Sequence, residues 1–524
     1  MTSPTPTRED KPNALSQPPQ EVWPVVIIGT GFSGLGMAIK LREAGIGPFV
    51  LLERAAEIGG TWRDNNYPGC ACDVPSPLYS FSFAPNPNWT RLYAGHDEIQ
   101  AYLVDVVKTY GLRPHIRFNQ EVACSRYDDK TRLWTVTTTS GESYRARVVI
   151  SGMGALSDPA LPNIDSMEDF QGERFHSAQW NHDFDVAGKR VAVIGTGASA
   201  IQFVPHLART AQRPHLFQRT PPWIVPRPDR PISPSERALY KRVPLAQKAL
   251  RGWIWSNLEL RALAFTGKPV LMKLAERFAR KHIGSQVTDP QLLEQVTPKF
   301  TIGCKRVLLS DDYYPALMRD NVTVVTDPIA RASTTGLETR DGKHYEFDAI
   351  IYGTGFAVQR QIPRGAIFGR GGADLAELWD EHMQAYKGTC VTGFPNLFFL
   401  AGPNTGLGHS SMVYMIESQI AYIIDALRQM KDGGWDSVEV QASAQARFNK
   451  TIAARQANTV WATGCRSWYL DDRGCNTTLW PGFTFQFRKT TARFDAEHYA
   501  IETTRDPATS ADGAAEQSAT ALVQ

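Results

Sequence analysis

A short apolar run that leads directly into closely spaced glycines is the feature that most constrains this chain. Residues 25–28 are Val-Val-Ile-Ile, and Gly29, Gly31 and Gly34 follow at once. A helical pattern comes next, and then a second apolar run at residues 49–52. A buried strand, a glycine turn, a helix and a second strand form the βαβ unit that binds a dinucleotide.

The same arrangement recurs later in the chain. Residues 191–194 lead into Gly195, Gly197 and Ala200, and a helical pattern and the run at residues 215–217 follow. Ala in place of the third glycine is a known variant of this motif. The sequence therefore predicts an α/β fold with two dinucleotide-binding, Rossmann-like domains.

The residue that ends each second strand distinguishes the two units. Glu53 stands 24 residues after Gly29, where a carboxylate accepts hydrogen bonds from ribose hydroxyls. The matching position in the second unit is Arg219, followed by Thr220. A guanidinium can bind a 2′-phosphate that a carboxylate would repel. We therefore expect FAD in the first unit and NADPH in the second.

The expected domain organisation follows from where strands and helices recur. A β excursion around residues 134–150 returns to the first sheet, and helical segments are expected at residues 262–273 and 274–282. The expected bounds are 1–21 for a disordered tail, 22–155 and 361–502 for the FAD-binding domain, 156–225 and 300–360 for the NADP-binding domain, 226–299 for a helical insert in the NADP-binding domain, and 503–524 for a second disordered tail.

Composition excludes several other classes. The 524 residues are 42% hydrophobic and carry a formal net charge of +3, without the basic excess of a nucleic-acid-binding protein. No apolar run reaches the roughly 18 residues that a membrane-spanning helix needs, and residues 1–21 do not read as a signal peptide. The seven cysteines form no zinc pattern. We expect a cytoplasmic protein with no metal and no obligate protein partner.

Two nucleotide units on one chain suggest hydride transfer from NADPH to flavin. A disulfide reductase of this fold would carry two cysteines separated by two or four residues beside the flavin, and the chain has none. Cys70 and Cys72 are separated by one residue, which favours a structural role. Reaction of the reduced flavin with oxygen is then the leading expectation, with electron transfer to a protein and a non-enzymatic flavin-binding role as alternatives.

The segment before the second unit carries a further pattern. Phe170, Gly172, His176 and Trp180 read F-x-G-x-x-x-H-x-x-x-W, which resembles the fingerprint of Baeyer–Villiger monooxygenases, although the next residue is Asn181 where that pattern has Pro or Asp. His176 and Trp180 would share one face if this segment were helical. The resemblance extends over about residues 25–488, and it implies that both residues couple the two domains.

The resemblance implies a specific activity. Members of the family use NADPH and O₂ to insert oxygen beside a ketone carbonyl through a flavin C4a-peroxide, giving an ester or lactone, and they can also oxidise sulfides. It assigns the cation that stabilises the developing negative charge to Arg306, and the acid that positions this cation to Asp73. A flavin monooxygenase that oxidises nitrogen or sulfur, which carries Tyr at the position of Trp180, stays as the alternative.

The resemblance also implies cofactor contacts over much of the chain. The loops around residues 467–482 are more similar to those of enzymes that oxidise aryl or linear ketones than to those of cyclohexanone enzymes. The expected cofactor-binding residues are Gly29, Gly31, Ser33, Gly34, Glu53, Thr61, Trp62, Asp73, Tyr79, Val122, Met412, Gly195, Thr196, Gly197, Ala198, Ser199, Ala200, Gln202, Arg219, Thr220, Lys305, Arg306 and Trp468.

Overall fold

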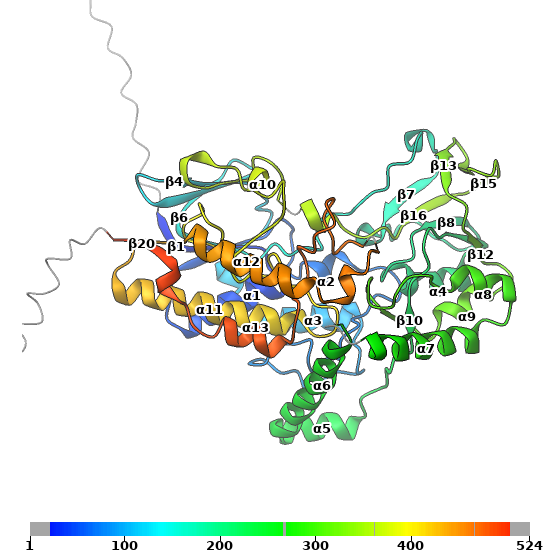
Figure 1. Cartoon of the computed structure of the whole chain (residues 1–524), viewed down its shortest axis with the longest axis horizontal. Coiled ribbons are helices and arrows are strands. Elements are labelled where there is room, and N and C mark those ends of the chain that lie inside the picture. Colours follow the sequence, from blue (N-terminus) through cyan, green and yellow to red (C-terminus); the bar gives the residue numbers. More distant parts are fainter. Residues whose placement is uncertain (1–20, 266–268, 361, 466, 504–524) are drawn as a thin grey trace, which may run out of the picture.

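Two separate sheets organise the computed structural model, each with helices packed against it (Figure 1). The structure describes residues 21–265, 269–360, 362–465 and 467–503. The expected disordered tails therefore lie outside the described residues, apart from Glu21 and Thr503. The prediction of an α/β fold with two Rossmann-like units is confirmed.

The first sheet runs in the order β17-β4-β5-β6-β1-β2-β3, and β18 also pairs with β6. Strand β1 lies parallel to both β2 and β6, whereas β4, β5 and β6 pair antiparallel, which confirms the predicted excursion. Its strands are β1 (Val22–Ile28), β2 (Phe49–Leu52), β3 (Ile116–Arg117), β4 (Val122–Asp128), β5 (Leu133–Thr138), β6 (Ser143–Ser151), β17 (Ile367–Phe368) and β18 (Leu397–Phe399).

Helices from both ends of the chain cover this sheet. The late helix α11 packs against α1, and Gly36 of α1 allows the approach, because a Cβ there would lie 3.0 Å from Ile420 Cδ1. Strands β19 (Ser437–Val440) and β20 (Tyr499–Glu502), far apart in the sequence, pair antiparallel in a separate two-stranded sheet. The helices are α1 (Phe32–Glu43), α2 (Thr61–Asp64), α3 (His96–Thr109), α10 (Leu375–Leu378), α11 (Met412–Gly433), α12 (Ala442–Gln456) and α13 (Thr484–Thr490).

The second sheet is parallel throughout, in the order β12-β9-β8-β16-β7. Helix α4 connects β8 to β9, as a βαβ unit requires, and a small antiparallel sheet adjoins it. The elements are β7 (Glu173–His176), β8 (Arg190–Ile194), α4 (Ala200–Thr210), β9 (Arg213–Phe217), α9 (Tyr313–Leu317), β12 (Thr323–Val325), β13 (Ile329–Ala332), β14 (Gly336–Thr339), β15 (His344–Glu346) and β16 (Ala349–Tyr352).

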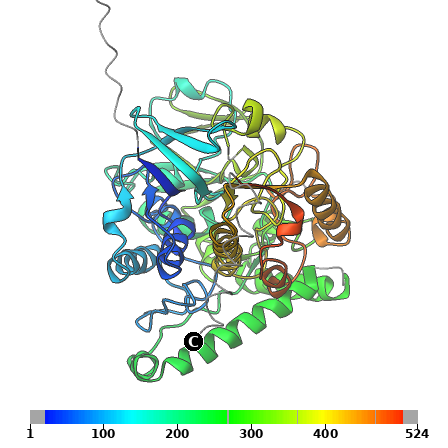
Figure 2. The same ribbon diagram turned by 90° about the vertical axis from the view of Figure 1, so that its left-hand side faces the viewer.

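Helices fill the segment between β10 (Ile224–Val225) and β11 (Leu308–Leu309), which pair with each other. Both views show α5 and α6 along one side of the molecule, away from the two sheets (Figures 1 and 2). The helices are α5 (Pro234–Arg242), α6 (Pro244–Phe265), α7 (Pro269–Gln286) and α8 (Pro290–Val296).

The predicted helix boundary at residues 273/274 is wrong. Helix α6 ends at Phe265, and α7 runs without a break from Pro269 to Gln286. Neither glycine nor proline stands at residues 273 and 274, so nothing interrupts the helix there. Among the described residues, no helix is both long and apolar enough to cross a membrane.

Candidate active site between the two nucleotide-binding units

The first glycine loop brings the backbone of α1 against the end of β1. Gly29 has a φ of +95°, and a Cβ there would lie 2.8 Å from the carbonyl oxygen of Gly152. A Cβ on Gly34 would lie only 2.0 Å from the carbonyl oxygen of Gly29. Beside Gly31 the space is open, with Gly59 O as the nearest atom at 3.9 Å. The loop thus fits a pyrophosphate at the N-terminus of α1, where Ser33 occupies the first turn.

Glu53, buried at the end of the first unit's second strand, holds this loop in place. Its Oε2 accepts hydrogen bonds from Thr30 N at 3.1 Å and Thr30 Oγ1 at 2.6 Å. Its Oε1 accepts from Arg63 Nη1 at 2.8 Å and from Ala55 N at 3.0 Å. The Gln120 amide, two residues before Val122, donates to the Glu53 carbonyl oxygen. The predicted ribose carboxylate therefore has a structural role as well, and Val122 lies close along the chain.

The second glycine loop repeats the design but has room for a methyl group at its third position. Gly195 has a φ of +107°, and a Cβ there would lie 2.4 Å from the carbonyl oxygen of Gly353. Ala200 is fully buried, and its Cβ would lie 3.1 Å from a Cβ placed on Gly353. The helix thus has room for a methyl group where the first unit has none. Gly197 and Ala198 are exposed, and Ser199 is the N-cap residue of α4.

Two cations lie close together at the far end of this loop. Thr196 Oγ1 donates to the Thr220 carbonyl oxygen at 3.0 Å, which joins the loop to the segment that follows β9. Arg219 is exposed there. Burial lowers the pKa of Lys305, and the nearby charge of Arg219 lowers it further. Two neighbouring positive charges without a carboxylate at the equivalent of Glu53 fit a 2′-phosphate.

Arg306 and Asp73, predicted as the catalytic pair, are in direct contact. Arg306 Nε and Nη2 both donate to Asp73 Oδ2, at 2.9 and 2.5 Å, and Nη1 donates to the Leu407 carbonyl oxygen at 3.3 Å. The charge of Asp73 raises the pKa of Arg306 far above its ordinary value. The guanidinium is therefore a permanent cation that three hydrogen bonds hold in one orientation.

Aromatic side chains of the first unit lie near this pair. Trp62 Nε1 donates to Tyr79 Oη at 3.2 Å, and the Tyr79 ring packs edge-on against Phe32 at 5.2 Å between centroids. Burial raises the pKa of Tyr79. The charge of Asp73 raises this pKa further, and the charge of Arg306 lowers it. Thr61 and Met412, both expected to bind a cofactor, are the first residues of α2 and α11.

The fingerprint residues form a turn, contrary to the helix considered above. His176 ends β7, a 3-10 turn covers Ser177–Gln179, and Trp180 follows it. A single helical face for His176 and Trp180 is therefore wrong, because the segment continues an edge strand paired with β16. Gly172 has no room for a side chain, since a Cβ there would lie 2.5 Å from Phe170 Cζ.

Trp180 starts a chain of contacts between the two units. Its ring packs on Phe203 of α4 at 5.4 Å, and Phe203 packs on Tyr67 at 5.9 Å. On the same helix, Gln202 Oε1 accepts from Tyr67 Oη at 2.9 Å, and its Nε2 donates to the Ala71 carbonyl oxygen at 2.9 Å. These contacts connect α4 to the segment that carries Asp73, so Gln202 binds protein groups of the first unit, and its predicted contact with the cofactor stays a prediction.

His176 has no features of a general base. It is buried, its Nδ1 accepts from the Ala178 amide at 3.1 Å, and its ring packs against Phe356. Burial lowers its pKa, which keeps the imidazole neutral.

Trp468, predicted to bind a cofactor, is 42% exposed. Its carbonyl oxygen accepts from Gln359 Nε2 at 3.1 Å, and its ring lies 4.4 Å from that of Tyr469. Tyr469 is 1% exposed and was assigned no role from the sequence. Burial raises the pKa of Tyr469 to about 12, and the positive charge of nearby Arg306 opposes this shift. Its place next to Trp468 is the only feature of the sequence that points to Tyr469 as a site residue.

A disulfide joins two segments that border the pair. Cys304, two residues before Arg306, is bonded to Cys465 across 161 residues of sequence. The sequence interpretation considered only cysteines close in sequence, and so it did not identify this pairing. Cys70 and Cys72 are free and buried, in agreement with their predicted structural role. Burial raises the pKa of Cys70 to about 12.

Known proteins match almost the whole described chain. A family model described as pyridine nucleotide-disulphide oxidoreductase matches residues 26–247. A Baeyer–Villiger monooxygenase of Pseudomonas aeruginosa is 54% identical over 92% of this chain and 92% of its own. One of Streptomyces coelicolor is 49% identical over 91% and 92%. The solved OTEMO complex with FAD and NADP is 28% identical, with a TM-score of 0.82 over 92% of this chain and 100% of its own.

The comparisons agree with the geometry. Two glycine loops fit two dinucleotides, one free of a 2′-phosphate and one carrying it, and relatives of this fold hold FAD and NADP. Arg306 and Asp73 lie near Tyr79 of the first unit. The chain belongs to the Baeyer–Villiger monooxygenases, and its cofactors are FAD and NADPH.

Proposed function

We propose that this Baeyer–Villiger monooxygenase acts on a small-molecule ketone, and that Arg306 and Asp73 carry the oxygen insertion. The single observation that supports this most strongly is the pair itself. Arg306 donates three hydrogen bonds, two of them to Asp73, and both residues are only about one-third exposed or less, at 28% and 30%. A cation oriented in advance stabilises developing negative charge without reorganising during the reaction.

The two glycine loops give each cofactor its place. Bound FAD, reduced by NADPH, would activate O₂ for transfer to the substrate. We assign the FAD pyrophosphate to the space beside Gly31, and its ribose to Glu53. We assign the 2′-phosphate of NADPH to Arg219, Thr220 and Lys305.

Arg306 acts on the substrate by charge. Attack on a ketone carbonyl places negative charge on the carbonyl oxygen, and migration of a carbon to oxygen then expels the leaving oxygen as an anion. The guanidinium favours both stages, because it donates hydrogen bonds from a fixed plane. Asp73 holds that plane in position, and Tyr469 lies close enough to interact with its charge.

The outcome of oxidation distinguishes this proposal from oxidation of nitrogen or sulfur. Purified holoenzyme with NADPH and O₂ would be given linear, cyclic and aryl ketones and thioanisole, with products identified by mass. We expect ketones to gain one oxygen and form esters or lactones, with aryl or linear ketones favoured. Sulfoxide as the sole product, with no ester from any ketone, would favour the heteroatom-oxidising alternative and contradict the proposal.

The domain bounds given above and a cytoplasmic location stay predictions. The alternation of strands between two sheets supports the bounds, since β17 and β18 return to the first sheet and β12 and β16 belong to the second. Limited proteolysis that releases a fragment near residues 226–299 without loss of FAD would support a separate helical insert.

A further inference from the structure

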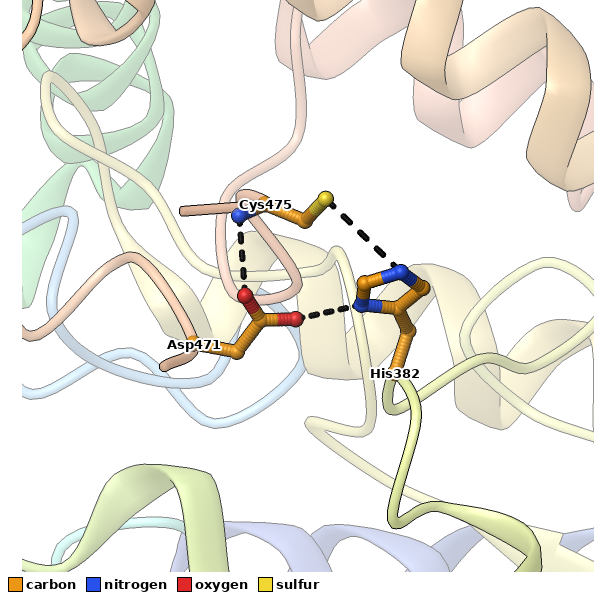
Figure 3. A group of neighbouring side chains, drawn as sticks. All are labelled: His382, Asp471 and Cys475. Carbon is orange, nitrogen blue, oxygen red and sulfur yellow. Dashed lines mark hydrogen bonds and ion pairs between the residues drawn. The ribbon is translucent and has the colours of Figure 1, made fainter. Parts of the chain in front are cut away.

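A hairpin immediately after Trp468 carries a group of reactive side-chain types that the oxidation of the ketone does not use. Leu470 pairs with Asn476 across the hairpin, and Asp471 N donates to the Cys475 carbonyl oxygen at 2.9 Å. Asp471 Oδ1 accepts from the Cys475 amide at 2.8 Å. His382, about 90 residues earlier in the chain, faces both side chains (Figure 3).

The three side chains form a relay from carboxylate to imidazole to thiol. Asp471 Oδ2 lies 2.6 Å from His382 Nδ1, and His382 Nε2 lies 3.8 Å from Cys475 Sγ (Figure 3). With the Nδ1 proton donated to the carboxylate, Nε2 is left as an acceptor facing the thiol. This is the arrangement of a nucleophile, a base and a group that orients the base.

The same residue types can bind a metal ion, but the contacts favour the relay. Among the described residues, these three form the only group of histidine, cysteine and acidic ligand atoms close enough to share an ion. Asp471 and Cys475, however, contact opposite nitrogens of the imidazole. An ion at Nε2 and Sγ would therefore have only two protein ligands, whereas zinc sites in proteins use three or four.

Cys475 is also the accessible thiol of the chain. All seven cysteines fall within the described residues: two form the disulfide, three are buried, Cys124 is half-buried, and Cys475 is exposed. Partial burial and the charge of Asp471 raise the pKa of Cys475, and Arg473 opposes the shift. The resting group is therefore a neutral thiol, and a base must remove its proton for it to react quickly.

We propose that Cys475 is a base-assisted thiol that reacts with hydrogen peroxide, with His382 as the base and Asp471 as the residue that orients His382. Sulfur attacks one peroxide oxygen, the O–O bond breaks, and the thiol proton passes through His382 Nε2 to the departing hydroxide. The products are the sulfenic acid of Cys475 and water, so sulfur is oxidised by two electrons and peroxide is reduced. The modified residue would lie on the hairpin that directly follows Trp468 and Tyr469.

Site-resolved labelling of the holoenzyme tests this proposal. Wild type, His382→Phe and Asp471→Asn would be treated with dilute hydrogen peroxide, and sulfenic acid would be trapped and located by mass. A positioned general base contributes about 10²–10⁴-fold to a proton transfer, so we expect the Cys475 rate to fall at least about tenfold in His382→Phe. The slower oxidation of Cys124 should stay unchanged in the same samples, which makes it an internal control.

Two results would overturn the proposal. The first is a rate of Cys475 oxidation in wild type that is no faster than that of Cys124, or that is the same in wild type and both variants. Asp471→Asn keeps an acceptor for the hairpin amides, so this variant decides the matter if His382→Phe fails to fold. The second is the binding of one Zn²⁺ per chain that protects Cys475 in wild type and is lost in Cys475→Ser, since the group would then be a metal site.

Discussion

The two nucleotide-binding units use one backbone design and differ in a few side chains. In the first, α1 lies so close to the sheet that a methyl group on Gly34 would reach 2.0 Å from Gly29 O. In the second, Ala200 occupies the equivalent position with its methyl group accommodated. At the ribose end, the first unit has a buried carboxylate, Glu53, and the second has the exposed Arg219.

This difference separates the residues that form a dinucleotide site from those that select the dinucleotide. The glycines determine how closely a helix and a phosphate can approach the strand. They therefore form a dinucleotide site but do not determine which dinucleotide binds. The charge at the end of the second strand determines which ribose is accepted. A change in the glycine loop should therefore abolish binding, whereas a change at the ribose end should alter selectivity.

The largest effect is expected from Gly34→Ala. The new methyl group would overlap a backbone oxygen, which a rotamer change cannot relieve, so α1 must move away from β1. We expect protein that is colourless or loses FAD on gel filtration. The measurement is the flavin absorbance per chain after purification, and a normal FAD content would contradict the close packing described here.

Arg219→Ala should change the selectivity of the second unit. A charge-assisted contact contributes about 1.5–3 kcal/mol, or roughly 10- to 150-fold in affinity. We expect the Michaelis constant for NADPH to rise by that factor and the constant for NADH to stay nearly unchanged. Arg213→Ala is the matched control, because Arg213 is an exposed arginine at the opposite end of β9. Equal increases for both nucleotides would contradict a 2′-phosphate contact.

Glu53→Gln should sharpen the comparison from the first unit. The substitution keeps the shape of the side chain but removes a charge that accepts from Thr30 and Arg63. Because hydrogen bonds to a charged group contribute about 1.5–3 kcal/mol, we expect FAD to bind about tenfold more weakly or worse. Titration of apoprotein with FAD measures this, with the exposed Glu43→Gln as control. Unchanged affinity would contradict the assignment of the FAD ribose to Glu53.

The smallest effect is expected from Ala200→Gly, the reverse of the first substitution. Glycine removes the methyl group that the second unit accommodates, and its extra freedom in the unfolded chain costs at most about 1 kcal/mol in a helix. We expect nearly normal use of NADPH and a slightly lower melting temperature. A loss of NADPH binding as severe as the expected loss of FAD in Gly34→Ala would remove the contrast between the two units.

Local patterns were sufficient to predict both βαβ units and the β excursion of the first sheet, because each depends on neighbouring residues. The contact of Arg306 with Asp73, 233 residues apart, was expected only from the family resemblance. Three other contacts depend on how distant loops meet. They are the approach of Tyr469 to Arg306, the disulfide of Cys304 with Cys465, and the relay of His382, Asp471 and Cys475. Spacing along the chain carries no signal for such contacts.

The most direct test of the account is the amount of ester formed per NADPH consumed by Arg306→Ala. Removing one oriented donor costs about 10²–10³ in rate, so we expect ester formation to fall by that factor. FAD should stay bound, because the contacts assigned to it lie in the other unit, and Arg331→Ala, which changes an exposed arginine of β13, should behave as wild type. Near-normal ester yield per NADPH in Arg306→Ala would contradict the assignment of oxygen insertion to the pair of Arg306 and Asp73.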